Sequence, residues 1–364
     1  MAARRLSTLR GLMSFPIPAT RVSQSRLTET LRENSEFGST FSDHMLVANC
    51  EAGSWQQPQI VPFGPISFSP ALTPFHYGQA IFEGFKAHRT PNGGVALFRP
   101  RENFARMNRS AARLAMPEIP ESLFLDGVAE LVRLDREWIP HREGGALYVR
   151  PVYFGVDDTL LVRPANRFRF IVMTCPVGPY FAQPIRLLAE ERFVRAFSGG
   201  TGDSKAAGNY AGGLLAARLA QEKGFHNVLW LDGVERRYVE ESGVMNIIFV
   251  LDGKAVTPPL GGTILPGVTR DSSLTLVREM GIPVEERRIT MDELLSAHSA
   301  RKLTEAFGVG TAAIVAPIAL IRYRDQELQF PAPTDSSVAA RLRSRLVGIQ
   351  TGREADKHNW LSPV

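Results

Sequence analysis

Apolar and polar residues recur with two different spacings along the first half of the chain. The apolar runs "FEGFKAHR" (82–89) and "VALFRP" (95–100) flank the turn-forming "TPNGG", so we expect a β-hairpin there. A helix is predicted after it, because apolar residues recur at helical spacing until Pro117 ends the pattern. Residues 146–155 and 167–177 are rich in Val, Tyr, Phe and Ile, which predicts two strands.

The second half of the chain mixes helices and strands in the same way. Residues 214–223 have a helical pattern that Gly224 closes, and a second helix is predicted within 266–283, between a Pro-Gly start and a Gly-Ile-Pro stop. "NVLWLDG" and "GVMNIIFVLDGKAVTPP" predict strands joined by Asp-Gly turns, and 304–318 predicts a strand interrupted by two glycines. The fold class is therefore mixed α/β (α+β), without the strict alternation of a doubly wound fold.

A length of 364 residues predicts two domains. Pro and Gly gather between two apolar runs around residue 180, which is typical of an interdomain connection. We expect an α/β domain over 37–180, a linker over 181–186 and a second α/β domain over 187–364. Residues 1–36 are expected to form a disordered basic leader, because recognisable sequence begins at Phe37.

Composition excludes several functional classes. The net charge of +5 comes from basic residues spread along the chain without a Lys/Arg block, so we expect no nucleic-acid partner. No apolar run is long enough to span a bilayer, and the two cysteines form neither a disulfide framework nor a CxxC metal motif. A reducing compartment, the cytoplasm, is expected. The alternative is the mitochondrion, because the N-terminus is rich in Arg and Ser and has no acid before Glu29.

One lysine, Lys205, lies in the small-residue segment "GGTGDSKAAGNYAGG" (199–213). The segment lacks the second glycine and the final hydroxyl of a P-loop, and its spacing does not match a dinucleotide fingerprint. A lysine in a partly desolvated site has a lowered pKa and can form a Schiff base, whereas the structural alternative is a flexible surface loop.

Pyridoxal phosphate is one cofactor that forms a Schiff base with a lysine. Its chemistry requires, besides that lysine, a phosphate site and an acid for the pyridine nitrogen. "LPGVTRDS" (265–272) opens a helix whose first N–H groups are unpaired, and "FGVGTAA" (307–313) offers a second small-residue turn. Glu241 is the acid candidate. The structural alternatives are a plain helix start for 265–272, a kinked strand for 307–313 and an ordinary turn glutamate for Glu241. Arg106, Arg109 and Arg113 share a helix face, and a solvated basic face is the favoured interpretation for the latter two.

Seven segments, in this order, resemble the branched-chain amino acid aminotransferases, which belong to the fold-type IV pyridoxal-phosphate enzymes. They are "HYGQAIFEGFKAHR", "ENFARMNRSAARLAMP", "ALYVRP", "GGTGDSKAAGNY", "EESGVMNIIFV", "LPGVTRDS" and "FGVGTAA". The resemblance covers the chain from Phe37 to its end and implies the two-domain fold-type IV architecture with pyridoxal 5'-phosphate as cofactor.

The resemblance also implies roles for individual residues. Lys205 would join the cofactor covalently and act as the catalytic residue, Tyr210 would hydrogen-bond its phenolic oxygen, and Glu241 would face the pyridine nitrogen. The phosphate would be held by Arg106, Val268, Thr269, Gly310 and Thr311. The aromatic side-chain pocket of the family matches Phe37, Tyr77, Phe82 and Tyr180. Tyr148 and Arg150 match the positions for the second carboxylate of glutamate, and Thr311 with Ala312 matches the turn for the α-carboxylate.

The implied function is transfer of the amino group of L-leucine, L-isoleucine or L-valine to 2-oxoglutarate by a ping-pong mechanism, in a homodimer or larger homo-oligomer. Alternatives are a D-amino acid aminotransferase, an aminodeoxychorismate lyase or a catalytically silent phosphate-ligand binding protein.

Two positions depart from the family pattern. Val244 stands where a small or hydroxyl residue is common near the cofactor. Ala313 and Ala316 replace a CxxC pair of some mitochondrial members, so no thiol switch is expected.

Overall fold

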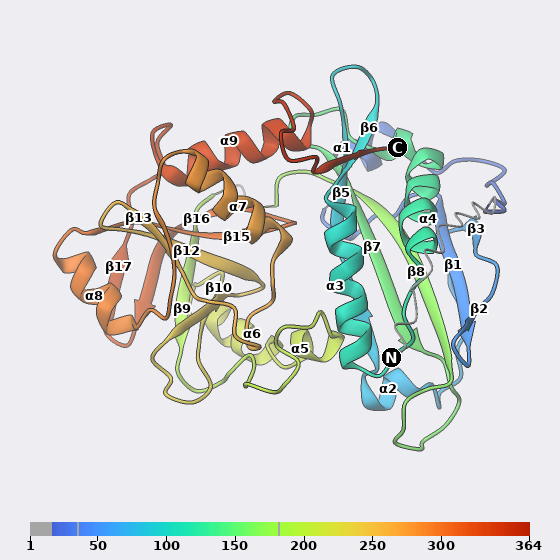
Figure 1. Ribbon diagram of the computed structural model, residues 1–364, viewed down its shortest axis with the longest axis horizontal. Coiled ribbons are helices and arrows are strands. Elements are labelled where there is room, and N and C mark those ends of the chain that lie inside the picture. The colour runs from blue at the N-terminus through green and yellow to red at the C-terminus, as the bar shows by residue number, and fades with distance from the viewer. Residues whose placement is uncertain (1–16, 35, 181–182) are drawn as a thin grey trace, which may run out of the picture.

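The computed structural model describes residues 17–34, 36–180 and 183–364. Their strands form two sheets, which make up the two lobes in Figure 1, blue to green on the right and yellow to red on the left. Helix α3 (Pro100–Arg113) lies on the side of the first sheet that faces the second lobe. The mixed α/β class predicted from the sequence is confirmed.

The first sheet is antiparallel, with the strand order β18-β6-β5-β7-β8-β1-β2, β3 beside β1 and β4 beside β7. Its strands are β1 (His44–Glu51), β2 (Ser54–Trp55), β3 (Gln59–Pro62), β4 (Ala80–Phe82), β5 (Phe85–Arg89), β6 (Val95–Phe98), β7 (Ala146–Gly155), β8 (Arg167–Val177) and β18 (Leu361–Pro363). The predicted hairpin is β5 and β6, and the two predicted strands are β7 and β8, so these predictions are confirmed.

The core of the first lobe lies between this sheet and helices α3 and α4 (Glu121–Leu134). Phe124 and Leu131 of α4 are completely buried, and the Phe124 ring stacks on Phe85 of β5 at 5.8 Å. Two short helices, α1 (Glu29–Asn34) and α2 (Thr73–Tyr77), and a 3-10 helix (Arg136–Trp138) complete the lobe. Met107 and Ala111 of α3 are buried in the same core, which fixes the orientation of this helix and of the site residues it carries.

Part of the segment expected as a disordered leader belongs to the fold. Residues 1–16 lie outside the described residues, but the Val22 N–H donates to Nε2 of buried His44 at 3.1 Å. Buried Asp43 accepts from the Ser25 hydroxyl and from the Arg26 N–H. Single polar anchors of this kind leave no periodic pattern in a sequence, so the composition of the segment did not reveal them.

The second sheet closes on itself. Strands β11-β10-β9-β16-β15-β12 pair in that order and β12 also pairs with β11, which makes a six-stranded barrel, with β13 and β14 continuing from β12 and β17 beside β16. The strands are β9 (Ile185–Glu190), β10 (Asn227–Leu231), β11 (Val239–Ser242), β12 (Met245–Leu251), β13 (Lys254–Thr257), β14 (Val284–Glu286), β15 (Leu303–Gly310), β16 (Ile314–Tyr323) and β17 (Gln326–Gln329).

Five helices accompany the barrel: α5 (Ala207–Ala211), α6 (Leu214–Glu222), α7 (Val268–Glu279), α8 (Met291–Ser299) and α9 (Val338–Gln350). Helices α7 and α9 cover one side, where Leu276 and Leu342 pack with Ile248 and Phe307 of the barrel. Helix α6 confirms the predicted helix that ends at Gly224, and α7 confirms the helix predicted within 266–283.

Three features differ from the sequence-based expectation. The single strand predicted over 304–318 is a hairpin, because β15 and β16 pair around a turn at 311–313. Strand β9 begins at Ile185, within the expected linker, of which residues 181–182 lie outside the described residues. Strand β18 pairs with β6 in the first sheet, although the expected boundary places it in the second domain. Within the part of the chain that the structure describes, the helices are too short or too polar to span a bilayer.

Candidate active site

One face of α3 carries the side chains that join the two lobes. Arg106, Ser110 and Arg113 follow one another at spacings of four and three residues, so they share this face. Arg106 Nη1 donates to the Pro266 carbonyl at 3.1 Å, and Ser110 Oγ accepts the Lys205 N–H at 2.9 Å. Arg113 donates to the Gly199 carbonyl at 3.0 Å. Its side chain is exposed, as expected for a solvated basic face, but it also binds the loop that precedes Lys205.

Lys205 is held from both sides of the lobe junction. Its carbonyl accepts the Phe82 N–H at 3.1 Å, and its Nζ donates to the Tyr210 hydroxyl at 2.9 Å. The Nζ also lies 4.7 Å from the centroid of the Phe82 ring. Tyr210 belongs to the short helix α5, which begins two residues after the lysine and therefore presents the tyrosine to the amine.

The surroundings of Lys205 shift its amine toward the neutral form. Burial, assisted by the charge of Arg106, lowers the pKa of Lys205 to about 8, whereas an exposed lysine titrates near 10.4. Burial and the Glu241 carboxylate raise the pKa of Tyr210 to about 12, so its hydroxyl stays protonated. The pair therefore combines a reactive amine with a phenol that can donate a hydrogen bond.

Arg106 forms a buried ion pair that was not anticipated from the sequence. Its Nε and Nη2 bond to the two oxygens of Glu83, at 2.7 and 2.8 Å, and Glu83 is completely buried. Nη2 also approaches Asn103 Oδ1 at 3.3 Å, and Nη1 donates to the Pro266 carbonyl. Of the five guanidinium hydrogens, one on Nη1 has no partner among these bonds and remains available for an anion.

Glu241 is buried at the β11–β12 pair, with one carboxylate oxygen hydrogen-bonded and the other beside Arg195. One oxygen accepts the Leu265 N–H at 2.8 Å and the Asn246 amide at 3.2 Å, and the other lies 3.0 Å from Arg195 Nε. The Arg195 Nε is not oriented as a donor in this pair, since Nη2 is turned to the Gly202 and Thr263 carbonyls. Burial raises the pKa of Glu241, and the charge of Arg195 opposes that shift.

Asn246 also explains the glycine that precedes α7. A Cβ placed on Gly267 would come within 2.0 Å of Asn246 Oδ1, and the Asn246 amide donates to the Leu265 carbonyl at 3.0 Å. Helix α7 then starts without a side-chain cap, so Val268 and Thr269 stand at an N-terminus that can accept an anion.

The β15–β16 turn brings a second set of small residues to the junction. Gly310 ends β15, Thr311 and Ala312 follow, and the Ala312 carbonyl accepts a hydrogen bond at 3.0 Å from Lys86 Nζ of β5. The turn is therefore tied to the first sheet across the junction, which brings the two candidate anion-binding segments and the lysine loop to the same lobe boundary.

All but one of the aromatic residues predicted for the site form one continuous group with the predicted Arg150. The Phe37 ring makes edge contacts with Tyr148 at 4.8 Å and with Tyr180 at 5.2 Å. The Arg150 guanidinium lies over Phe82 at 4.8 Å and over Tyr148 at 5.3 Å, and Phe82 lies 4.7 Å from Tyr210. A Cβ on Gly84 would clash with the Tyr148 hydroxyl, so the glycine makes room for it.

Tyr77 is the exception among the predicted residues. It ends α2, is 43% exposed, and its hydroxyl donates to the Leu160 carbonyl. None of the contacts described for Tyr77 reaches Lys205 or the Phe37–Tyr148 group. Val244, the position that departs from the family pattern, is 63% exposed in the turn between β11 and β12.

Four residues of the site were not singled out from the sequence: Glu83, Ser110, Arg195 and Asn246. Glu83 stands among apolar residues in "AIFEGF", and a carboxylate in such a run needs a partner. Ser110 lies four residues after Arg106, on the same helix face. Asn246 likewise stands in an apolar run, "MNIIFVL", where a polar side chain needs a partner. Arg195 has no comparable signal, because its partners are more than four residues distant in sequence.

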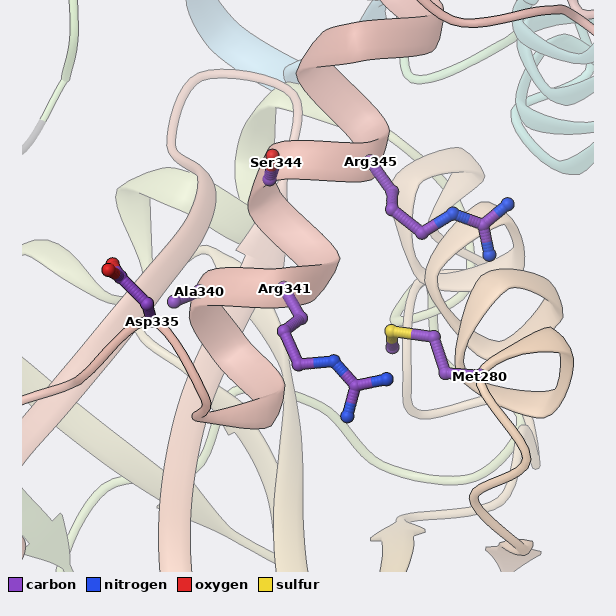
Figure 2. Close-up of a pocket in the computed structure, with 6 residues that line it drawn as sticks. All are labelled: Met280, Asp335, Ala340, Arg341, Ser344 and Arg345. Carbon is purple, nitrogen blue, oxygen red and sulfur yellow. The ribbon is translucent and has the colours of Figure 1, made fainter.

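A surface hollow of about 390 Å³ lies elsewhere, between α9 and the end of α7. Figure 2 shows Arg341 and Arg345 extending from α9 toward Met280, with Ser344 on the same helix and Asp335 on the loop that precedes it. Arg345 already pairs with Glu279. Because the hollow is at the opposite end of α7 from Val268, roughly 18 Å away for a helix of this length, it is separate from the lysine site.

Comparisons with known proteins identify similar chains. Residues 80–321 match the family model of amino-transferase class IV. The chain is 44% identical to a probable branched-chain-amino-acid aminotransferase of Staphylococcus aureus, over 92% of this chain and 96% of that protein. It is 42% identical to branched-chain-amino-acid aminotransferase 2 of Bacillus subtilis, over 90% of this chain and 92% of that protein. The crystal structure of the branched-chain aminotransferase from Thermoproteus uzoniensis with norvaline superposes with a TM-score of 0.71. That protein shares 26% identity with this chain, over 88% of this chain and 99% of its own.

The lowered pKa of Lys205 has a measurable consequence. We expect reductive methylation of Lys205 in the cofactor-free protein by formaldehyde and cyanoborohydride, followed by peptide mass spectrometry, to reach half its maximal rate near pH 8. Nα-acetyl-lysine in solution should reach it near 10.4, because only the neutral side-chain amine reacts. The Lys205→Arg variant identifies the labelled peptide, and a midpoint near that of free lysine would contradict the effect of burial.

Proposed function

The chain belongs to the class IV aminotransferases, and from this membership we propose that it transfers the amino group of L-leucine, L-isoleucine or L-valine to 2-oxoglutarate, giving branched 2-oxo acids and L-glutamate. The resemblance to branched-chain aminotransferases noted in the sequence is confirmed. The observation that carries the proposal is the Lys205–Tyr210 pair beside Arg106 and Glu241, because it supplies an activated amine next to an anion site.

The residues at the junction fit pyridoxal 5'-phosphate. The unused Nη1 hydrogen of Arg106, the uncapped start of α7 at Val268 and Thr269, and the Gly310–Thr311 turn would hold the phosphate. Tyr210 would donate to the phenolic oxygen and Glu241 would pair with the pyridine nitrogen. When bound, this cofactor supplies an aldehyde that holds the substrate nitrogen and a ring that accepts the electron pair released at Cα.

The protein's own residues then position and move protons. Lys205, with its lowered pKa, takes the proton from the substrate Cα as a general base, and the same amine serves both halves of a ping-pong cycle. Burial favours the neutral form of Glu241, whereas Arg195 and the Leu265 N–H favour the carboxylate. These two partners therefore oppose the effect of burial and favour the carboxylate, the form that would hold a protonated pyridine nitrogen.

A single pocket must accept both a branched chain and the carboxylate of glutamate. Phe37, Tyr148, Tyr180 and Phe82 supply an apolar surface for the branched chain. Arg150 stacks on two of these rings, its Nε is buried without a partner, and its one described side-chain bond goes to the Tyr148 hydroxyl. Its remaining donors are therefore available to a second carboxylate, while its flat face stays compatible with an apolar neighbour. Thr311 and Ala312 would receive the α-carboxylate.

We also propose a homodimer. The α2–Leu160 surface, defined as Phe75, Tyr77, Leu160, Leu161 and Val162, is held together by the Tyr77 hydroxyl on Leu160 and by the Thr159 N–H on the Ala71 carbonyl. Leu161 and Val162 are 64% and 83% exposed. Adjacent apolar side chains at this exposure are typical of a protein interface, and the family resemblance implies that the neighbouring subunit contributes to the pocket.

A donor panel tests the proposed activity. We expect L-leucine, L-isoleucine and L-valine each to convert 2-oxoglutarate to glutamate over many turnovers, and Lys205→Ala to abolish it. The exposed Lys302→Ala variant is the matched control and should keep wild-type turnover. D-Alanine as the preferred donor, pyruvate release from aminodeoxychorismate, or cofactor binding without turnover would each replace the proposal with one of the alternatives named above.

The proposed binding of the second carboxylate by Arg150 predicts that its removal weakens the binding of glutamate and 2-oxoglutarate selectively. We expect Arg150→Met to raise KM for glutamate and 2-oxoglutarate roughly tenfold or more, and to change KM for leucine less than about threefold. A charge-assisted hydrogen bond contributes about 1.5–3 kcal/mol, and 1.4 kcal/mol corresponds to a tenfold change. Arg109→Met, on the exposed face of α3, is the matched control. An equal loss for leucine and glutamate would rule out the selective role.

The dimer is tested by sedimentation velocity. We expect a mass twice the 40.2 kDa of the chain at micromolar concentration. Val162→Asp should shift the protein toward monomer and lower its activity, because a charge would be buried in the interface. Val234→Asp, at an equally exposed valine on a different turn, should do neither. A monomeric wild-type protein with full activity would show that the surface serves another purpose.

A further inference from the structure

Lys86 is a buried cation outside the set of residues described for the cofactor. It lies on β5 opposite Tyr148 of β7, and its side chain is only 4% exposed. Among the ion pairs of the described residues, none includes Lys86; its side-chain hydrogen bond goes to the Ala312 carbonyl at 3.0 Å, across the lobe junction. A buried charge without a counter-ion is costly, so its retention calls for a functional explanation.

The groups around Lys86 leave its charge uncompensated. His88, two residues along the same face of β5, is buried with neither ring nitrogen bonded, and burial together with the Lys86 charge lowers its pKa to about 3. Burial raises the pKa of the Cys175 thiol to about 11, so it too is neutral. Burial and the charge of Arg343 lower the pKa of Lys86 to about 8, which still leaves the ammonium charged at pH 7.

The carbonyl that accepts the hydrogen bond of Lys86 links this side chain to the proposed substrate site. Ala312 lies in the turn between β15 and β16. Its carbonyl and the N–H of Ala313 belong to one planar trans peptide group, so they point in opposite directions. A cation that holds the Ala312 carbonyl therefore fixes the orientation of the turn and of its N–H groups. It also places a positive charge, in a medium of low dielectric, a few ångströms from the backbone that would receive a carboxylate.

We propose that Lys86 is a positioning residue for the α-carboxylate of every substrate, because it orients the Thr311–Ala313 turn from the opposite lobe and adds a positive potential there. The inference rests on the proposed function, in which this turn binds the α-carboxylate. It distinguishes Lys86 from Arg150, since the α-carboxylate is common to all substrates whereas the second carboxylate belongs to glutamate and 2-oxoglutarate alone.

The test is the Lys86→Met holoenzyme, which keeps the length and apolar stem of the side chain without its charge. We expect KM for leucine and for glutamate to rise by a similar factor, roughly tenfold. The inhibition constant Ki for 4-methylvalerate, which has the carbon chain and carboxylate of leucine without its amine, should rise equally. We expect kcat to change much less, and the thermal midpoint to stay the same or rise, because an unpaired buried charge is removed. Lys302→Met is the matched control.

A merely structural lysine would give the opposite pattern, namely a lower thermal midpoint with an unchanged Ki, and that result would overturn the inference. Lys86→Gln is the second variant in case Lys86→Met does not fold. It keeps an N–H donor without the charge, and we expect a Ki between those of the wild type and Lys86→Met. A wild-type Ki in Lys86→Gln would also overturn the inference. If the wild-type protein itself does not transaminate, the proposed function fails first, and the two failures are therefore distinguishable.

Discussion

The buried pair of Glu83 and Arg106 is the interaction on which the site depends. Glu83 lies between β4 and β5 of the first sheet and Arg106 on α3, so the pair fixes the helix against the sheet through two bonds below 3 Å. Removal of either partner would leave an isolated charge in the core, which costs about 3–5 kcal/mol. With α3 fixed, Arg106 reaches Pro266 and Ser110 reaches Lys205 one turn further along the same helix.

Charge also explains why an anion belongs at this junction. Four basic side chains, those of Lys205, Arg106, Arg150 and Arg195, lie near two carboxylates, those of Glu83 and Glu241. Four positive groups against two negative ones leave an excess of two when all are ionised. A dianionic phosphate would balance this excess. It would also moderate the repulsion from Arg106 that, after burial, depresses the pKa of Lys205. The protein thus holds an electrostatic strain that ligand binding relieves.

Much of the fold followed from local patterns, whereas the way the lobes meet did not. The β5–β6 hairpin and helices α6 and α7 each lie in one short segment with its own turn and cap residues, and periodicity located them. The barrel closure between β11 and β12 and the return of β18 to β6 depend on long-range pairing, which no local pattern encodes. At the site, Lys205 could be chosen from its surroundings alone. The family resemblance was needed for Glu241 and Arg106, and Arg195 was found only through its bonds in the folded chain.

The path of the chain through the first sheet has a consequence for biosynthesis. Strand β6 is made early, but its partner β18 consists of Leu361–Pro363, so roughly 260 residues separate the synthesis of the two. During translation the first lobe therefore presents an open edge at β6, with the unpaired N–H and C=O groups that favour pairing with another chain. At synthesis rates of about 5–20 residues per second, this edge stays uncovered for roughly 13–50 seconds. Nascent chains of this protein consequently have a defined interval in which a chaperone or a neighbouring nascent chain can occupy the place of β18.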